Sequence, residues 1–137
     1  MKDLPKSVHV GIDDYEIELM SAGEAEAREK SGESIFTYAK QRVRIREDLP
    51  PTEAAATLFH ELLHLVWHER GIRNDDSEER VVAALERGMA IVWRENPEVM
   101  RWIHEGLAGQ QRVPLSSAAE GTVSREQVQS AIKGEIA

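Results

Sequence analysis

The sequence predicts a small α+β domain in which short strands come first and helices follow. Before Pro50, short runs of residues alternate in polarity, as strands of a half-buried sheet do. After Pro51, apolar residues recur at the spacing of a helix. The length of 137 residues suits one domain with one modest core. We therefore expect a small N-terminal antiparallel sheet packed on a long helix.

The strand region is predicted from four short runs. Residues 8–10 and 15–19 alternate in polarity on either side of a turn that contains Gly11. Residues 21–33 are polar and acidic, and we expect a loop or a short exposed helix there. Residues 35–38 and 42–46 predict two further strands, and the two prolines after Leu49 end the region because proline cannot donate to a strand ladder.

Three helices are predicted after the prolines. The first begins with Thr52 as its cap and ends at Gly71. The second covers residues 77–95, with Ser77 as its cap and one apolar stripe. The third starts at Pro97 with Asn96 as its cap. We expect the stripe (Val81, Val82, Leu85, Met89 and Val92) and the three tryptophans (Trp67, Trp93 and Trp102) to pack into the core.

The last part of the chain is predicted to be separate from the domain. Residues from 106 to 122 are rich in Gly, Ser and Ala and show little periodicity. A capping-box pattern of Ser124 with Gln127 predicts a small helix near the end. We therefore expect a domain over residues 1–106 and a peripheral segment or tail over residues 107–137.

Composition excludes several classes of partner. The formal charge of −8 and the pI near 5.1 argue against a nucleic-acid-binding surface, and no apolar run is long enough to span a membrane. Basic residues at alternate positions (Lys40, Arg42, Arg44 and Arg46) indicate the solvated face of a strand. There are no cysteines, so disulfides and thiolate metal sites are excluded, and a reducing compartment such as the cytoplasm is expected.

The most specific chemical signal is the pattern His-Glu-x-x-His at His60, Glu61 and His64. Residues four apart lie on one face of a helix, so the two imidazoles can bind one zinc ion. The acid beside the first histidine can then activate a zinc-bound water, as a general base does in a metallopeptidase. The alternative is a buried helix that carries two histidines for other reasons, but unpaired buried polar groups are costly and a metal would pair them.

A third zinc ligand must come from elsewhere in the chain. Glu78 and Glu79 open the second predicted helix, and Glu78 shares the apolar stripe that should face the motif helix. We predict Glu78 as the third ligand, with Glu79 as the alternative. Both acids could instead serve only to stabilise the helix N-terminus, where negative charge is favourable.

Other histidines and a tyrosine are weaker candidates. His68 lies roughly 12 Å along the helix axis from His60, too far to bind the same ion. It could support the site without binding the ion, or donate in the transition state, but we expect it to be a partly exposed helix residue. His104 and Tyr38 are possible donors to an oxyanion, and His9 is expected to be a strand residue without a role.

Over residues 35–103 the chain resembles small zincin-like proteins encoded by phages and prophages. The resembling stretches are 57–64 (TLFHELLH), 78–82 (EERVV), 85–89 (LERGM) and 95–97 (ENP). More distantly, the chain is similar to metallopeptidases of the ImmA/IrrE and SprT types. It differs from the ImmA/IrrE pattern in having Val81 and Val82 where that pattern has an Ala-Asn pair.

The resemblance implies a minimal zincin-like fold of gluzincin type. In it, a few strands and the motif helix are followed by a helix whose opening glutamate, here Glu78 or Glu79, binds zinc. The expected function is that of a zinc-dependent metallopeptidase acting on a protein or peptide in the host cytoplasm. The alternative is an inactive interaction protein in which zinc is structural.

Overall fold

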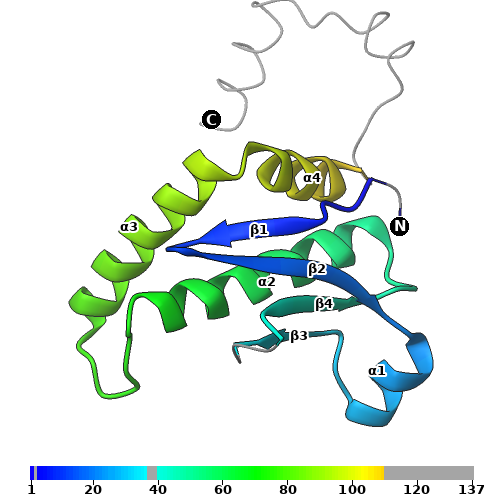
Figure 1. Ribbon diagram of the computed structural model, residues 1–137, viewed down its shortest axis with the longest axis horizontal. Helices are drawn as coiled ribbons and strands as arrows, with labels where there is room; N and C mark the ends of the chain where they lie inside the picture. The colour runs from blue at the N-terminus through cyan, green and yellow to red at the C-terminus, as the bar shows by residue number, and fades with distance from the viewer. Residues whose placement is uncertain (2, 37–39, 110–137) are drawn as a thin grey trace, which may run out of the picture.

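The computed structural model describes residue 1 and residues 3–36 and 40–109. It shows an α+β domain with a four-stranded mixed sheet and four helices (Figure 1). The predicted helix near residue 124 and Tyr38 lie outside the described residues, as does most of the predicted tail. Within the described residues, no helix is long and apolar enough to cross a membrane.

The sheet contains β1 (Ser7–Val10), β2 (Asp13–Met20), β3 (Gly32–Ile35) and β4 (Arg42–Arg46), in the order β1-β2-β4-β3. β1 and β2 form an antiparallel hairpin, whose turn contains Gly11 at a positive φ of 65°. The strands predicted at 8–10, 15–19 and 42–46 are confirmed. The strand predicted at 35–38 was placed too late, because β3 pairs with β4 from Gly32 to Ile35.

The sheet is mixed, so the prediction of an antiparallel sheet is wrong. β3 pairs antiparallel with β4, but β2 and β4 run parallel. The reason is the connection after β2: helix α1 (Ala22–Arg28) leads the chain to the outer edge, where β3 forms, and β4 then returns between β3 and β2. α1 is the short helix predicted as one of two possibilities for this stretch, and the hydroxyl of Ser21 caps it by accepting from the Glu24 amide.

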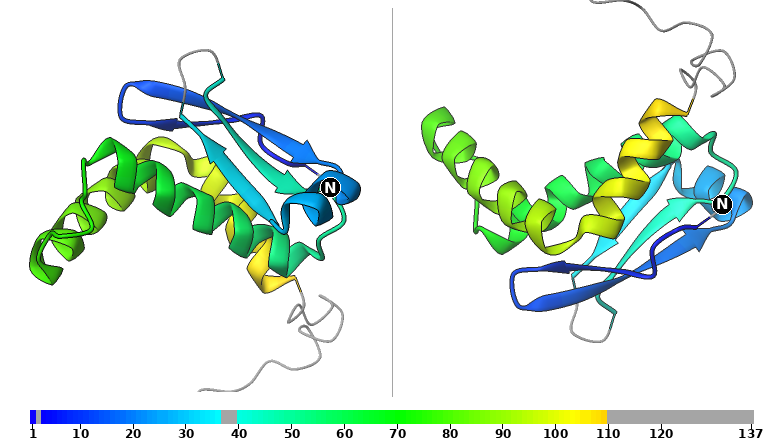
Figure 2. Two further views of the ribbon diagram at one scale, coloured as in Figure 1. Left: turned by 90° about the horizontal axis from the view of Figure 1, so that it is seen from below. Right: turned by 90° about the horizontal axis from the view of Figure 1, so that it is seen from above.

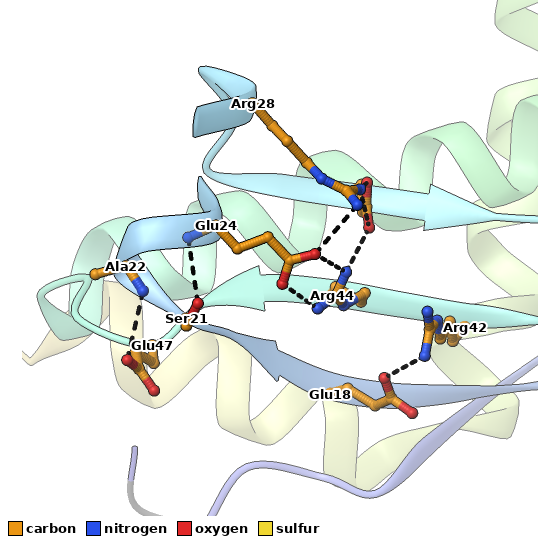
Figure 3. Close-up of polar contacts among 9 residues, drawn as sticks. Glu18, Ser21, Ala22, Glu24, Arg28, Arg42, Arg44 and Glu47 are labelled. Atoms are coloured by element: carbon orange, nitrogen blue, oxygen red, sulfur yellow. Dashed lines mark hydrogen bonds and ion pairs between the residues drawn. The ribbon is translucent and has the colours of Figure 1, made fainter. Parts of the chain in front are cut away.

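The two faces of the sheet have opposite chemistry. Val43 and Ile45 of β4 are buried in the main core, on the face that packs against the helices. The arginines that alternate with them along β4 point to the other face, where α1 lies (Figure 3). There Arg44 forms ion pairs with Glu24 at 2.6 Å and with Glu33 at 2.9 Å. Arg42 also pairs with Glu18 and Arg46 with Glu26, so the three arginines of the basic run are paired with acids of the same domain.

Helix α2 (Pro51–Glu69) lies across the apolar face of the sheet and supplies much of the core. The prediction that Thr52 caps it is wrong. The helix starts two residues earlier than a cap at Thr52 implies, at Pro51, and Pro50 is the N-cap without a side-chain hydrogen bond. The Thr52 hydroxyl instead donates to the carbonyl of Gly106, at 3.3 Å.

Helices α3 (Glu78–Glu95) and α4 (Pro97–Ala108) complete the domain. Ser77 caps α3 as predicted, accepting from the amide of Arg80 at 3.3 Å. The predicted cap at Asn96 makes no side-chain cap bond to α4. Its side chain is buried against β1, where Oδ1 accepts from the His9 amide at 2.8 Å and Nδ2 donates to the His9 carbonyl at 2.7 Å.

α3 extends away from the body of the domain (Figure 2). It crosses α2 at Gly88, where an added side chain would collide with Val66. Its first half lies beyond this crossing and is poorly covered, so the predicted stripe is only partly in the core. Val82 is 53% exposed and Trp93 60% exposed, which corrects the prediction that both pack inside. Trp67 and Trp102 are half-buried.

Candidate metal centre

Helix α2 presents the two motif histidines side by side. Leu62 and Leu65 are fully buried, which fixes the rotation of the helix about its axis. His60 and His64 therefore lie on its exposed side, one turn apart. Their Nε2 atoms are 3.1 Å apart, and the ring planes cross at 73°.

This arrangement fits a shared zinc ion. Two imidazole nitrogens bound tetrahedrally at the usual Zn–N length are about 3.3–3.4 Å apart. The observed separation of 3.1 Å is within a few tenths of an ångström of that value, and both rings lie on the exposed side of α2. Neutral imidazoles are also the commonest metal ligands in proteins.

Glu61 is held between α2 and the edge strand β3. Only 4% of its surface is exposed, which separates it from an ordinary glutamate on a helix surface. The Ser34 hydroxyl donates to Glu61 Oε2 at 2.5 Å. Gly32 leaves room for the other oxygen, since a Cβ there would stand 3.0 Å from Oε1. The carboxylate is thus fixed beside the histidines by a strand far away in sequence.

A cleft of about 680 Å³ lies over this group. It is bounded on one side by β3 and the residues before it, and on the other by one face of α2. Its lining includes Lys30, Ser31, Gly32, Glu33, Ser34, Phe36, Ala56, Thr57, His60, Glu61 and His64. Since β3 is a terminal strand of the sheet, its outer backbone groups are not engaged by another strand of the described residues. The sequence analysis missed Ser34 and Gly32, because no spacing in the chain connects them to the motif.

The predicted third ligand is not beside the histidines. Glu78 and Glu79 open α3, and both are exposed. The core-facing orientation expected of Glu78 is therefore wrong, because the first half of α3 extends past α2. In the part of the chain that the structure describes, no three His, Cys, Asp or Glu side chains are grouped closely enough to hold a metal ion. The third ligand remains a prediction.

The other candidates lie at different places. His68 is exposed, as expected, and its ring lies 4.3 Å from that of Phe36 beside a second hollow of about 420 Å³. His104 is exposed on α4 and does not line the cleft. His9 forms a hydrogen bond with Asp14 at 2.8 Å, and this bond is the main cause of a pKa above the usual value for histidine.

A mixed sheet packed on a helix that turns His-Glu-x-x-His toward a cleft is the arrangement of a metallopeptidase-like domain. The family model of the IrrE N-terminal-like domain, a peptidase family, matches residues 9–89. The chain belongs to this family, which confirms the resemblance to the ImmA/IrrE type. No curated protein and no solved structure matches the chain.

Proposed function

We propose that the protein is a zinc-dependent metallopeptidase that hydrolyses peptide bonds of a protein or peptide. The observation that supports this most strongly is the group on α2: two converging imidazoles and a buried glutamate at the floor of one cleft. Membership of the IrrE N-terminal-like family supports the same class of activity. Action in the cytoplasm and a phage or prophage origin are part of the proposal.

In this proposal His60 and His64 hold the zinc ion, with Glu78, or alternatively Glu79, as the third ligand. Bound zinc polarises a carbonyl and lowers the pKa of water. Glu61 accepts a proton from the attacking water and delivers it to the leaving amine. Ser34 fixes the Glu61 carboxylate through the bond to Oε2, so the base is in position before substrate arrives.

The cleft favours an extended substrate. A peptide laid along the free edge of β3 would form strand-like backbone hydrogen bonds and pass over the histidines. A folded protein would need to expose a flexible segment to enter. A specificity profile with a preference for tightly folded proteins would count against this part of the proposal.

The test combines metal content with catalysis. Elemental mass spectrometry of the purified chain should give near one zinc per molecule, and the double variant His60→Ala/His64→Ala should lose it. Glu61→Gln should keep the metal and the fold but lose peptidase activity. The matched control is Glu53→Gln, an exposed glutamate in the first turn of the same helix, which should keep both metal and activity.

The alternative function is an inactive interaction protein with a structural zinc. The exposed position of Glu78 and Glu79 favours inactivity, because a catalytic zinc needs a third protein ligand. A structural zinc would need four, so its remaining ligands would have to come from elsewhere. Zinc in the wild type without hydrolysis of any peptide in a library would favour it. Absence of zinc even after zinc is supplied would overturn both functions.

A further inference from the structure

We propose that the hollow at the end of α2 is a substrate subsite for a large aromatic side chain, on the N-terminal side of the bond that is cut. This hollow of about 420 Å³ adjoins the cleft over the metal centre, because Phe36 and His64 line both. The inference rests on the proposed function and adds a substrate preference to it.

Aromatic rings form one wall of the hollow. Phe36 packs against the core, with the ring of Tyr15 edge-on to it at 6.3 Å, so its position is fixed from behind. The exposed ring of His68 lies 4.3 Å from that of Phe36, with 32° between the two planes. Trp67, half-buried, lines the same hollow. Such a wall suits a further ring, because aromatic pairs contribute more than the area that they bury.

The turn that ends α2 forms a second wall. Gly71 has a positive φ of 60° there, and the Ile72 amide donates to the Trp67 carbonyl at 3.1 Å. The turn brings Ile72 to the hollow, where only 6% of its surface is exposed. The hollow is therefore bounded by apolar groups that the fold holds in place.

The charge at the rim disfavours ionic side chains in the hollow. Arg73 is the charged residue that lines it, and a substrate lysine or arginine would meet this like charge. The guanidinium already pairs with Asp75 at 3.2 Å, and both side chains are 75% exposed. An acidic substrate side chain would have to compete with that carboxylate. The hollow thus favours an uncharged ring.

The hollow is within reach of a side chain close to the bond that is cut. His64 and His68 are one turn apart, about 6 Å along the axis of α2. An extended chain rises about 3.3 Å per residue. A peptide bond held at the metal therefore places a side chain one to three residues away beside the hollow.

The direction of β3 determines which side of the bond this residue is on. Ser34 of β3 bonds to Glu61, and Phe36, just after the strand, contacts His68. β3 and α2 therefore run in the same direction along the cleft. A peptide pairs more stably with a strand edge when it runs antiparallel. It would then pass the hollow first and the metal afterwards, so the aromatic residue precedes the bond.

Digestion of a random peptide library by the zinc-loaded wild type tests the preference. Mass spectrometry of the products should show Phe, Tyr or Trp enriched at one of the three positions before the cut bond. A peptide with alanine at that position should be cleaved with at least a tenfold lower kcat/KM, since even one methylene group in an apolar pocket changes this constant by about tenfold or more.

A change in the aromatic wall tests which residues set the preference. His68→Ala should lower the ratio of kcat/KM between the aromatic and the alanine peptide by about two- to tenfold. His68 is exposed, so circular dichroism should show an unchanged fold. His104→Ala, an exposed histidine on α4, is the matched control and should keep the full ratio. A loss of the same factor for both peptides in His68→Ala would overturn the subsite.

Binding separates this inference from the proposed function. Immobilised, zinc-loaded Glu61→Gln protein should retain aromatic peptides from the same library, and the added change His68→Ala should reduce that enrichment. Enriched binding without cleavage by the wild type would overturn the peptidase function but keep the hollow as an aromatic binding site. Cleavage without an aromatic preference, or with one after the cut bond, would overturn the subsite and keep the peptidase function. Neither binding nor cleavage would overturn both.

Discussion

Helices α2 and α3 are almost equal in length but are held by the fold to very different degrees. α2 has 19 residues, of which seven are buried (Ala54, Ala55, Leu58, Glu61, Leu62, Leu65 and Val66). α3 has 18 residues, and only two of them are buried. The difference follows from their places: α2 is enclosed between the sheet and α4, whereas α3 meets the domain mainly around one crossing (Figure 1).

The difference between the two helices determines which of the expected zinc ligands the fold holds in position. His60 and His64 project from a helix that the core holds in place, so their rings converge without help. Glu78 and Glu79 project from the end of α3 that has the fewest neighbours. The core therefore fixes the positions of the two histidines, whereas the position of the expected third ligand depends on where the first turn of α3 lies.

The largest effect is expected in the core under α2. Leu62→Ala removes a fully buried side chain below the motif and should lower the free energy of unfolding by about 2–5 kcal/mol. The matched change on α3, Val82→Ala, should alter it by less than about 0.5 kcal/mol. Urea denaturation measures both. Equal losses would show that α3 is packed as tightly as α2.

The next effect concerns the third ligand. If Glu78 binds zinc, Glu78→Gln should weaken zinc binding by more than about 100-fold, the upper end of what loss of an outer-shell partner costs. Glu79→Gln should then change it little, and zinc should slow hydrogen exchange in the first half of α3. Competition titration with a zinc chelator measures the affinity. A larger loss in Glu79→Gln would reverse the assignment, and no loss in either would exclude α3 as a source of ligands.

A third effect tests the crossing of the two helices. Gly88→Ala introduces a methyl group against Val66 and should lower the free energy of unfolding by about 1–3 kcal/mol, although alanine is the better helix former. Gly23→Ala in α1 is the control: its added methyl meets no atom within 4 Å, so it should stabilise by up to about 1 kcal/mol. Thermal unfolding measures both. A gain in both variants would show that the crossing is loose.

The smallest effect concerns the charged face of the sheet. The hydrogen bond from Arg44 is the main cause that holds the pKa of Glu24 below its ordinary value of 4.5. The pair should therefore stabilise the fold above that pH, and the contribution should fade as acid protonates Glu24. Urea midpoints of the wild type and Glu24→Gln should converge as the pH falls below about 4. A difference that stays constant across this range would contradict the role of the pair.

The sequence was sufficient for the features that depend on local spacing. The α+β class, three of the four strands, the position of α3 and the convergence of His60 and His64 all follow from periodicity or from capping residues. These are short-range properties, because a helix or a strand imposes them on its own residues. The motif therefore predicted that the two histidines lie one turn apart on one side of α2.

The features that depend on long-range contacts could not be predicted from the sequence. Ser34 meets Glu61 only because β3 takes the outer edge of the sheet, and nothing near either residue indicates that pairing. The stripe on α3 predicted a buried face, but periodicity does not say whether another element lies over it. Thr52 and Asn96 have the right residue type for caps, yet both bond to distant backbone groups instead.

The hydrogen bonds between Asn96 and β1 also affect the tendency of the protein to aggregate. A free strand edge invites pairing with other chains, which leads to aggregation. Asn96 occupies both backbone groups of His9, so part of the β1 edge is closed by a side chain acting in place of a strand. β3 has no such protection by a described side chain on its backbone. The edge of β3 that is suited to bind a substrate is thus also the edge most open to pairing with other chains. Changes in β3 would therefore affect both solubility and activity.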